Sequence, residues 1–170
     1  MTGEIQEFVK HCIETYPLAG KVLELGSRDI CGSVRRWFTK DGQQKEPTMR
    51  FPLYIGVDRE EGALVDQVMD TNALTFADGE FDVVISTSAI EHDFYFWRSL
   101  AEGERMLRSG GYFILTAPSW RGCPPHALPQ DYYRFTDIAI RAWLMEIGME
   151  CLECLDCEQD GCIHSIGRKL

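Results

Sequence analysis

The sequence has few basic residues for its size. Its 170 residues include 17 Lys and Arg against 27 Asp and Glu, a formal net charge of −10. A surface this acidic repels phosphate backbones and anionic lipid, which argues against non-specific binding to nucleic acid or membranes. Long apolar runs and the basic, apolar start of an export signal are also missing. We therefore expect a cytoplasmic protein with no nucleic-acid or membrane partner.

The cysteine count does not suggest a disulfide framework. Seven cysteines are an odd number, and without an export signal they are expected to be free thiols. Cys151, Cys154, Cys157 and Cys162 have the close spacing of a zinc or iron–sulfur site. Strand alternation, however, places Cys151 and Cys157 on one face and Cys154 on the other, so three ligands would not converge. We expect ordinary buried thiols and no bound metal.

The rest of the chain alternates between apolar strand-length runs and helical patterns. Thr136 is a candidate helix N-cap, and Gly110-Gly111 is a candidate helix C-cap. Strands are predicted at 21–26, 53–58, 65–70, 81–88 and 111–118, helices at 2–16, 33–40, 95–108 and 136–147, loops at 41–52 and 119–135, and a closing hairpin at 149–170.

This alternation predicts an α/β fold: a Rossmann-like three-layer sandwich with a mostly parallel twisted sheet and an antiparallel C-terminal hairpin strand. The length predicts one domain, 1–170. Its expected parts are an N-terminal helix in 1–20, a cofactor-binding core in 21–118, an acceptor-side loop in 119–135, and a helix plus closing hairpin in 136–170.

Ligands of such sheets bind at the carboxyl ends of the strands, where the strand order reverses. Gly26 follows the first predicted strand and permits a tight turn and a close backbone approach. Asp58 and Asp70 end the next two strands, and carboxylates there suit a ribose diol. The dinucleotide fingerprint G-x-G-x-x-G is missing, because Gly26 has no second glycine before Gly32. This favours a nucleoside ligand without a pyrophosphate.

Five segments carry a family resemblance: VLELGSRD, YIGVD, FDVVISTSAIEH, MLRSGGYFILTAP and PQDYYRFT. Together they resemble a class I S-adenosylmethionine-dependent methyltransferase of the small type-11-like group. The resemblance covers residues 21–169 and includes the antiparallel last strand. The sequence departs from the family in the glycine loop, where Gly26 is followed by Ser27, Arg28 and Asp29 in place of G-x-G.

The resemblance implies S-adenosyl-L-methionine as the cofactor and a set of residues that bind it. The implied set is Glu24 and Gly26 beside the amino-acid part, Ser27 and Arg28 in the same glycine loop, Asp58 at the ribose hydroxyls, Asp70 with the backbone of Thr71 at the adenine, and the backbone of Ser86 and Thr87 near the methionine end.

The acceptor side is expected in the loop 119–135 and just after the fourth strand. His126 is the first candidate for a general base and His92 the second, although His92 also suits capping or orienting the next helix. Arg134 is expected to pair with Asp131 or Glu91. Trp120, Tyr132, Tyr133 and Phe135 form either an aromatic acceptor pocket or a hydrophobic plug that folds the loop.

Two nucleic-acid acceptor classes lack their signatures. No N/D-P-P-Y/F follows the fourth strand, and Cys123-Pro124-Pro125 is in the wrong order for a Pro-Cys nucleophile.

With no separate substrate domain, we expect O- or N-methylation of a small molecule or a glycan by a monomer or homodimer. Two alternatives remain: a non-catalytic module that binds S-adenosylmethionine or S-adenosylhomocysteine and acts through a partner, and a nucleotide-binding Rossmann-like enzyme.

Overall fold

Seven strands form one sheet in the computed structural model, which describes residues 3–30, 32–40, 48–126 and 129–170. The elements in chain order are α1 Gly3–Thr15, β1 Lys21–Leu25, the 3-10 turn η1 Arg35–Trp37, β2 Leu53–Asp58, β3 Gln67–Val68, β4 Phe81–Thr87, the 3-10 turn η2 Ile90–His92, α2 Phe96–Met106, β5 Leu107–Pro118, α3 Asp137–Glu146, β6 Met149–Cys157 and β7 Cys162–Lys169.

The strand order is β3-β2-β1-β4-β5-β7-β6, and this order places the ligand edge. The first five strands are parallel, whereas β7 is antiparallel to both β5 and β6. The chain moves outward from β1 to β3 and then returns to the other side of β1 with β4. The carboxyl ends of β1 and β4 therefore form the switch point at which such sheets bind ligands. The predicted fold class is confirmed.

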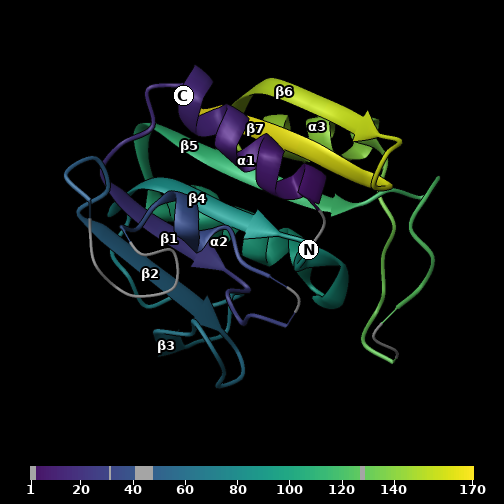
Figure 1. Ribbon diagram of the computed structural model, residues 1–170, viewed down its shortest axis with the longest axis horizontal. Coiled ribbons are helices and arrows are strands. Elements are labelled where there is room, and N and C mark those ends of the chain that lie inside the picture. The colour runs from purple at the N-terminus through teal and green to yellow at the C-terminus, as the bar shows by residue number, and fades with distance from the viewer. Residues whose placement is uncertain (1–2, 31, 41–47, 127–128) are drawn as a thin grey trace.

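Helices cover both faces of the sheet (Figure 1). The buried residues of α1, among them Phe8 and Cys12, pack with η1 against one face, and α2 and α3 cover the other. Thr136 caps α3 as predicted, because its Oγ1 accepts a hydrogen bond from the Ala139 amide at 3.0 Å. Among the described residues, no helix combines the length and apolar composition needed to cross a membrane.

Two predicted elements are shorter than expected. The helix predicted at 33–40 is only the turn η1, because Arg35 turns inward and its guanidinium donates to the carbonyl oxygens of Leu64 at 3.0 Å and Tyr54 at 3.3 Å. The strand predicted at 65–70 is only β3, because the Asp66 carboxylate accepts the Gly56 amide at 2.8 Å and takes the place of a strand partner. Of the predicted loop 41–52, residues 41–47 lie outside the described residues.

The expected helix cap at Gly110-Gly111 is wrong. Helix α2 ends at Met106, and β5 begins at once with Leu107. The two glycines lie inside β5, where the pairing with β4 shifts register. Gly110 has a φ of +76°, and a Cβ on Gly111 would come within 2.9 Å of two backbone carbonyl oxygens. The glycines therefore permit a bulge in a strand.

The expected alternation of the cysteines along β6 is also wrong. A register shift between Cys151 and Glu153 adds one residue to the strand. As a result Cys151 and Cys154 both pack against the same core cluster, while Leu152 packs against the other. The six cysteines that the structure describes are free thiols.

Candidate functional site

Gly26 leads the chain out of β1 in a left-handed turn, with a φ of +73°. A Cβ at this position would come within 2.5 Å of the Ala89 Cβ, so the close approach is made by the loop after β4. The next residue, Ser27, is buried against Gly56 of β2. Arg28 extends over the turn after β2 and forms an ion pair with Glu60. The glycine loop is therefore held between the ends of β2 and β4.

Asp58 stands at the end of β2, half-buried beside this loop. One carboxylate oxygen accepts the Arg28 amide at 3.3 Å, and the other accepts the Glu60 amide at 3.0 Å. Each carboxylate oxygen can accept a second hydrogen bond, so the oriented group retains capacity for a ligand diol. The structure thus joins two sequence-predicted residues, Arg28 and Asp58, by a direct contact.

Asp70 and Thr71 lie in a hydrogen-bond network with the start of α2. The Asp70 carboxylate accepts the amide and the side-chain nitrogen of Asn72, at 2.9 and 3.0 Å. Asn72 and Ser99 both donate to Asp93, and Ser99 also donates to Thr71 at 2.8 Å. The network fixes the segment after β3 against the segment after β4, which frame the predicted adenine position.

Glu24 is buried within β1, and its environment is electrostatically mixed. Burial raises the pKa of the Glu24 carboxyl to about 7, although the neighbouring Arg35 guanidinium opposes this shift. Arg35 itself forms an ion pair with Asp66 and stacks over the Tyr54 ring. Glu24 is therefore a buried acid that would ionise more readily if a positive group approached it.

Buried oxygens without partners lie at the ends of β1 and β4. Glu24 Oε2, Ser27 Oγ and Ser86 Oγ have no hydrogen-bond partner within the described protein. Unsatisfied buried polar groups cost stability, and a polar ligand would remove that cost. Thr87 is also buried, and Ser88 after it adopts a positive φ of 48°. The predicted cofactor residues therefore fit a ligand rich in hydrogen-bonding groups.

The loop 119–135 returns to the sheet at the same edge (Figure 1). Its ends are joined by backbone hydrogen bonds, from Phe135 to Pro118 at 2.9 Å and from Trp120 to Phe135 at 3.0 Å. Arg134 links the two sides of the loop. It donates to the Asp131 carboxylate through two nitrogens, at 2.6 and 2.7 Å, and to the Cys123 carbonyl oxygen at 2.7 Å. This pairing lowers the pKa of Asp131 to about 2. Arg134 is thus part of the loop's structure, and Asp131 is the partner it takes.

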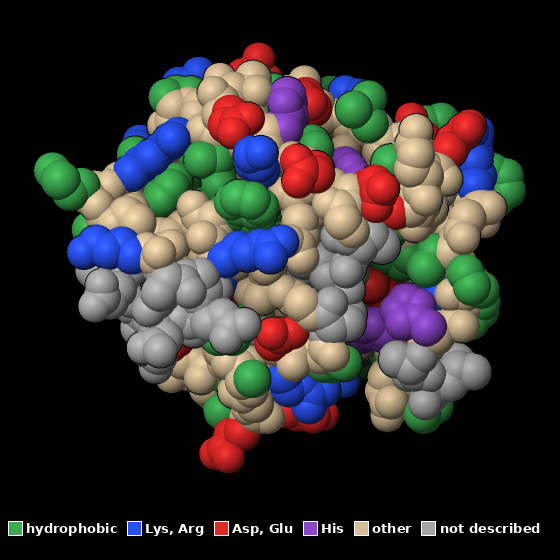
Figure 2. All heavy atoms as spheres, in the orientation of Figure 1, with side chains coloured by type: hydrophobic (Ala, Val, Ile, Leu, Met, Phe, Trp, Pro, Cys, Tyr) green, Lys and Arg blue, Asp and Glu red, His purple; other side chains and the backbone are tan. Residues whose placement is uncertain are grey.

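His92 and His126 meet above Glu91. Their ring centroids are 5.0 Å apart, and their Nε2 atoms lie 3.7 and 4.0 Å from Glu91 Oε1. The Glu91 side chain is almost completely buried, and burial raises its pKa to about 7. Histidine side chains are seen together on the right of the face shown in Figure 2, beside an acidic side chain. The two candidate general bases, His92 and His126, therefore form one histidine group that packs against the Glu91 carboxylate.

The four aromatic residues of the loop divide into two pairs. Phe135 is buried, and Tyr133 packs against the core and donates its hydroxyl to the Phe94 carbonyl at 2.9 Å. Trp120 and Tyr132 are 60% and 43% exposed. Phe135 and Tyr133 thus anchor the loop as a plug, whereas Trp120 and Tyr132 are exposed.

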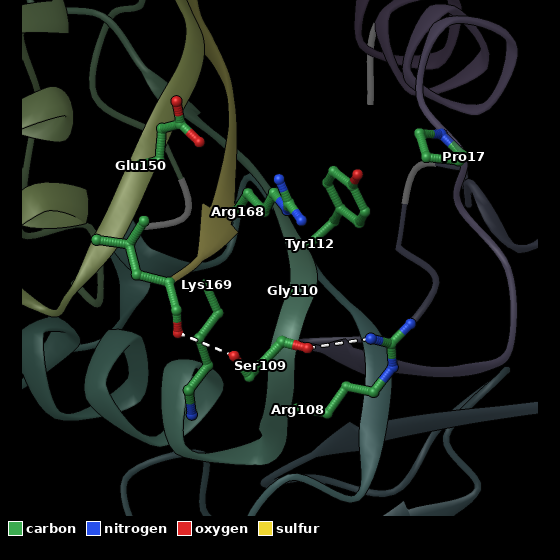
Figure 3. Close-up of a pocket in the computed structure, with 9 residues that line it drawn as sticks. Pro17, Arg108, Ser109, Gly110, Tyr112, Glu150, Arg168 and Lys169 are labelled. Atoms are coloured by element: carbon green, nitrogen blue, oxygen red, sulfur yellow. Dashed lines mark hydrogen bonds between the residues drawn. The ribbon is translucent and has the colours of Figure 1, made fainter.

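A cavity of about 530 Å³ lies at the opposite edge of the sheet, where the parallel strands begin (Figure 3). Its walls include Arg108, Arg168 and Lys169, and Ser109 Oγ there donates to the Leu170 carbonyl at 3.1 Å. None of the sequence-predicted site residues lines this cavity.

Sequence reasoning missed the roles of two acids. The sequence suggests Glu91 only as a partner of Arg134, yet in the structure its carboxylate lies against both His92 and His126. Asp93 joins Asn72 and Ser99 and also accepts the Tyr95 amide at the start of α2. The spacing of the acids in Glu91-His92-Asp93, directly after a strand end, was the available signal.

Solved structures with the same architecture are methyltransferases in several cases. The chain of a Haloferax volcanii complex between the Trm112 methyltransferase activator and a putative methyltransferase aligns with a TM-score of 0.72 and 16% identity, over 97% of this chain and 90% of that one. Burkholderia thailandensis 1,6-didemethyltoxoflavin-N1-methyltransferase, solved with S-adenosylhomocysteine, aligns with a TM-score of 0.71 and 16% identity, over 98% of this chain and 77% of that one. An Aquifex aeolicus SAM-dependent methyltransferase aligns with a TM-score of 0.70 and 14% identity, over 98% of this chain and 92% of that one. At these identities the likeness shows the fold: a Rossmann-like methyltransferase architecture.

The family follows from the sequence itself. The type-11 family model, described as a methyltransferase domain, matches residues 29–115, more than half of the chain. No curated protein matches the sequence. The chain belongs to the type-11 methyltransferase family, within the class I S-adenosylmethionine-dependent methyltransferases, as the sequence motifs predicted. S-adenosyl-L-methionine is the cofactor of this class.

Proposed function

We propose that the protein methylates a hydroxyl or amino group of a small molecule or sugar residue. The observation that carries the proposal is the meeting of two sets of residues at one edge. Asp58, Asp70 and Glu24 stand at the ends of β2, β3 and β1, and the histidine group stands after β4 beside the loop 119–135. A cofactor held by the first set would present its methyl group toward the second.

The cofactor residues are assigned by their chemistry and position. When bound, S-adenosylmethionine supplies a methyl group activated by a positively charged sulfur. The oriented carboxylate of Asp58 suits the ribose diol, and the segment at Asp70 and Thr71 suits the adenine edge. Glu24, Gly26, Ser27 and Arg28 surround the place left for the amino-acid part, with Ser86 and Thr87 near its methionine end.

The acceptor is positioned by the loop and the histidine group. Methyl transfer forms a bond from the acceptor atom to the methyl carbon while the carbon–sulfur bond breaks, and holding the atoms in line is worth up to ~7–11 kcal/mol. A hydroxyl or amine must also lose a proton. His126, whose side chain is 45% exposed, is more accessible than His92, whose side chain is 26% exposed. We assign His126 the contact with the reacting group, with Trp120 and Tyr132 available to an acceptor ring.

The size of the acceptor follows from what covers the site. The loop 119–135 is a short segment that returns to this edge, and the ion pair of Asp131 with Arg134 holds it in place. Such a short cover suits a small molecule or one sugar residue better than a folded macromolecule. The overall charge of −10 also disfavours a nucleic acid.

Turnover of S-adenosylmethionine labelled in the methyl group, over a panel of hydroxyl and amine acceptors, tests this function. We expect methylated product from one acceptor class. Asp58→Ala should lose both cofactor binding and turnover, whereas His126→Ala should keep cofactor binding and lose turnover by about 10²–10⁴-fold. Asp78→Ala is a matched control, because Asp78 is a 79% exposed acid paired with Arg105. Equal turnover in His126→Ala would remove His126 from the mechanism.

A second candidate is a module that binds the cofactor and acts through a partner. The observation in its favour is the likeness to the chain from a complex with a methyltransferase activator. This candidate predicts tight binding of S-adenosylmethionine with no turnover by the isolated chain across the panel. A nucleotide-binding enzyme, the remaining alternative, predicts binding of NAD in place of S-adenosylmethionine.

A further inference from the structure

Glu91 is a buried acid without hydrogen-bond partners. Its side chain is 1% exposed, and neither Oε1 nor Oε2 has a hydrogen-bond partner within the described protein. The Glu91 main chain is fixed by the Tyr132 amide, which donates to its carbonyl at 2.9 Å. A buried carboxylate in this state is unfavourable unless a cation or a proton donor joins it. The position therefore calls for a positively charged partner.

Two imidazole nitrogens face this carboxylate. His92 Nε2 is 3.7 Å from Glu91 Oε1, and His126 Nε2 is 4.0 Å from the same oxygen. These distances are too long for hydrogen bonds. Two atoms that each lie ~2.1 Å from one tetrahedral ion are about 3.4 Å apart, so these distances exceed those around a shared ion by a few tenths of an ångström. One ligand atom from each of the three residues lies within 4.8 Å of the others, so a small closure completes the set.

The remaining ring nitrogens are held from behind. His92 Nδ1 lies 2.5 Å from the Gln130 carbonyl oxygen, so it carries the proton and leaves the Nε2 lone pair toward Glu91. His126 Nδ1 lies 3.4 Å from the Pro124 carbonyl oxygen, 3.7 Å from Asp131 and 3.3 Å from Arg134 Nη2. A carbonyl or carboxylate behind a ligand histidine is the usual support of a metal site. The guanidinium charge of Arg134 is offset by Asp131.

We propose that Glu91, His92 and His126 bind a divalent transition-metal ion of the Zn²⁺ type. Two imidazoles and one carboxylate are borderline ligands, which suit Zn²⁺ and its neighbours; Mg²⁺ and Ca²⁺ prefer oxygen ligands alone. Three protein ligands with His126 half-exposed leave a coordination position open toward the acceptor side. An open position is the mark of a catalytic metal site.

The consequence for the reaction rests on the proposed function. A hydroxyl that occupies the open position would lose its proton to solvent more easily, since a bound metal ion lowers the pKa of a coordinated oxygen. His126 would then contact the reacting oxygen through the ion, as a ligand, and would not accept the proton itself. The acceptor class would then be an alcohol or phenol oxygen. The metal site itself does not depend on methyl transfer and is tested without the cofactor.

Another group of possible ligands, Cys157, Asp160 and His164, serves as a comparison. Asp160 Oδ2 is 3.0 Å from His164 Nε2, so this carboxylate and imidazole already satisfy each other. The contrast with Glu91 is the reason for placing the ion at the histidine pair. The comparison group also means that an experiment must distinguish sulfur ligands from nitrogen ligands.

Titration with Co²⁺ makes this distinction. Protein treated with a chelator, dialysed and kept reduced is titrated with Co²⁺ by absorption spectroscopy, and Zn²⁺ affinity is measured by competition. We expect one ion per chain, visible d–d bands and no thiolate charge-transfer band. His92→Ala and His126→Ala should each lose about 100-fold or more in affinity. Glu91→Gln keeps the side-chain shape and tests the carboxylate alone.

His11→Ala is the matched control, because His11 is exposed and its Nε2 lies 3.0 Å from another glutamate, Glu153. It should leave the affinity unchanged. Binding that survives both His92→Ala and His126→Ala, a thiolate band, or saturation by Mg²⁺ in place of Zn²⁺ would each overturn the proposal. His92→Ala and His126→Ala should lose metal binding and keep S-adenosylmethionine binding, so they test the metal site alone. Asp58→Ala tests cofactor binding and therefore the proposed function.

Discussion

Replacement of Glu24 by Gln should remove a pH dependence of stability. Burial raises the pKa of Glu24 from 4.5 to about 7 in the folded chain. The stability that the protonated group contributes is fully present below pH 4.5 and is lost as the pH rises through 7, because the unfolded chain ionises first. At 1.36 kcal/mol per unit, the loss is about 3 kcal/mol. Glu24→Gln has no such proton to lose.

The assay is urea denaturation of both proteins at pH 5 and pH 8. The free energy of unfolding of the wild type should fall between these pH values by about 2–3 kcal/mol more than that of Glu24→Gln. Taking the difference between the two proteins cancels the titration of the other groups, Glu91 included. Parallel pH profiles would refute the assignment of Glu24 as a buried acid with a raised pKa. A steeper profile in Glu24→Gln would contradict the sign of the shift.

Three further substitutions test the frame of the site. Gly26→Ala should lower the free energy of unfolding by about 2–4 kcal/mol, because the new side chain combines a positive φ with the 2.5 Å approach of the Ala89 Cβ. Gly148→Ala is the control, because Gly148 has a φ of +83° and open space around it; it should cost only about 1 kcal/mol in the same denaturation assay. Arg134→Met should cost about 2 kcal/mol and expose the loop 119–135 to limited proteolysis, and unchanged cleavage would contradict the clamp. Asp93→Ala should cost about 1–2 kcal/mol through the lost hydrogen bonds, and an unchanged urea midpoint would show that they add nothing.

The sheet was predictable because each strand of the core is a continuous apolar run. The apolar runs of β1, β2 and β4 also show where each strand ends. The sequence therefore predicts that Gly26 and Asp58 lie at the carboxyl ends of β1 and β2, where a ligand binds. The antiparallel hairpin followed from its turn. What periodicity cannot show is a side chain that replaces a backbone partner, and this is why Asp66 shortened β3 and Arg35 shortened the helix predicted at 33–40.

Bulges were the second source of error. Gly110 and Gly111 have the composition of a helix cap, but they lie inside β5, in the stretch between Leu107 and Tyr112 where the pairing with β4 shifts register. The bulge in β6 likewise brings Cys151 to the same face of the sheet as Cys154. In the site, the contact between residues 91–92 and 126 is long-range and depends on how the loop 119–135 folds back. Sequence spacing therefore identified His92 and His126 as candidates and did not show that they meet over Glu91.

We expect the carboxyl ends of β1, β2 and β3 to bind S-adenosylmethionine. Calorimetric titration with S-adenosylmethionine and S-adenosylhomocysteine, with NAD as the control ligand, tests it most directly. We predict one site per chain for the first two ligands, no binding of NAD, and at least about 100-fold weaker binding in Asp58→Ala, since hydrogen bonds to a charged acceptor contribute ~1.5–3 kcal/mol each. Folded protein that binds neither ligand, or binds both equally well in Asp58→Ala, would contradict the account.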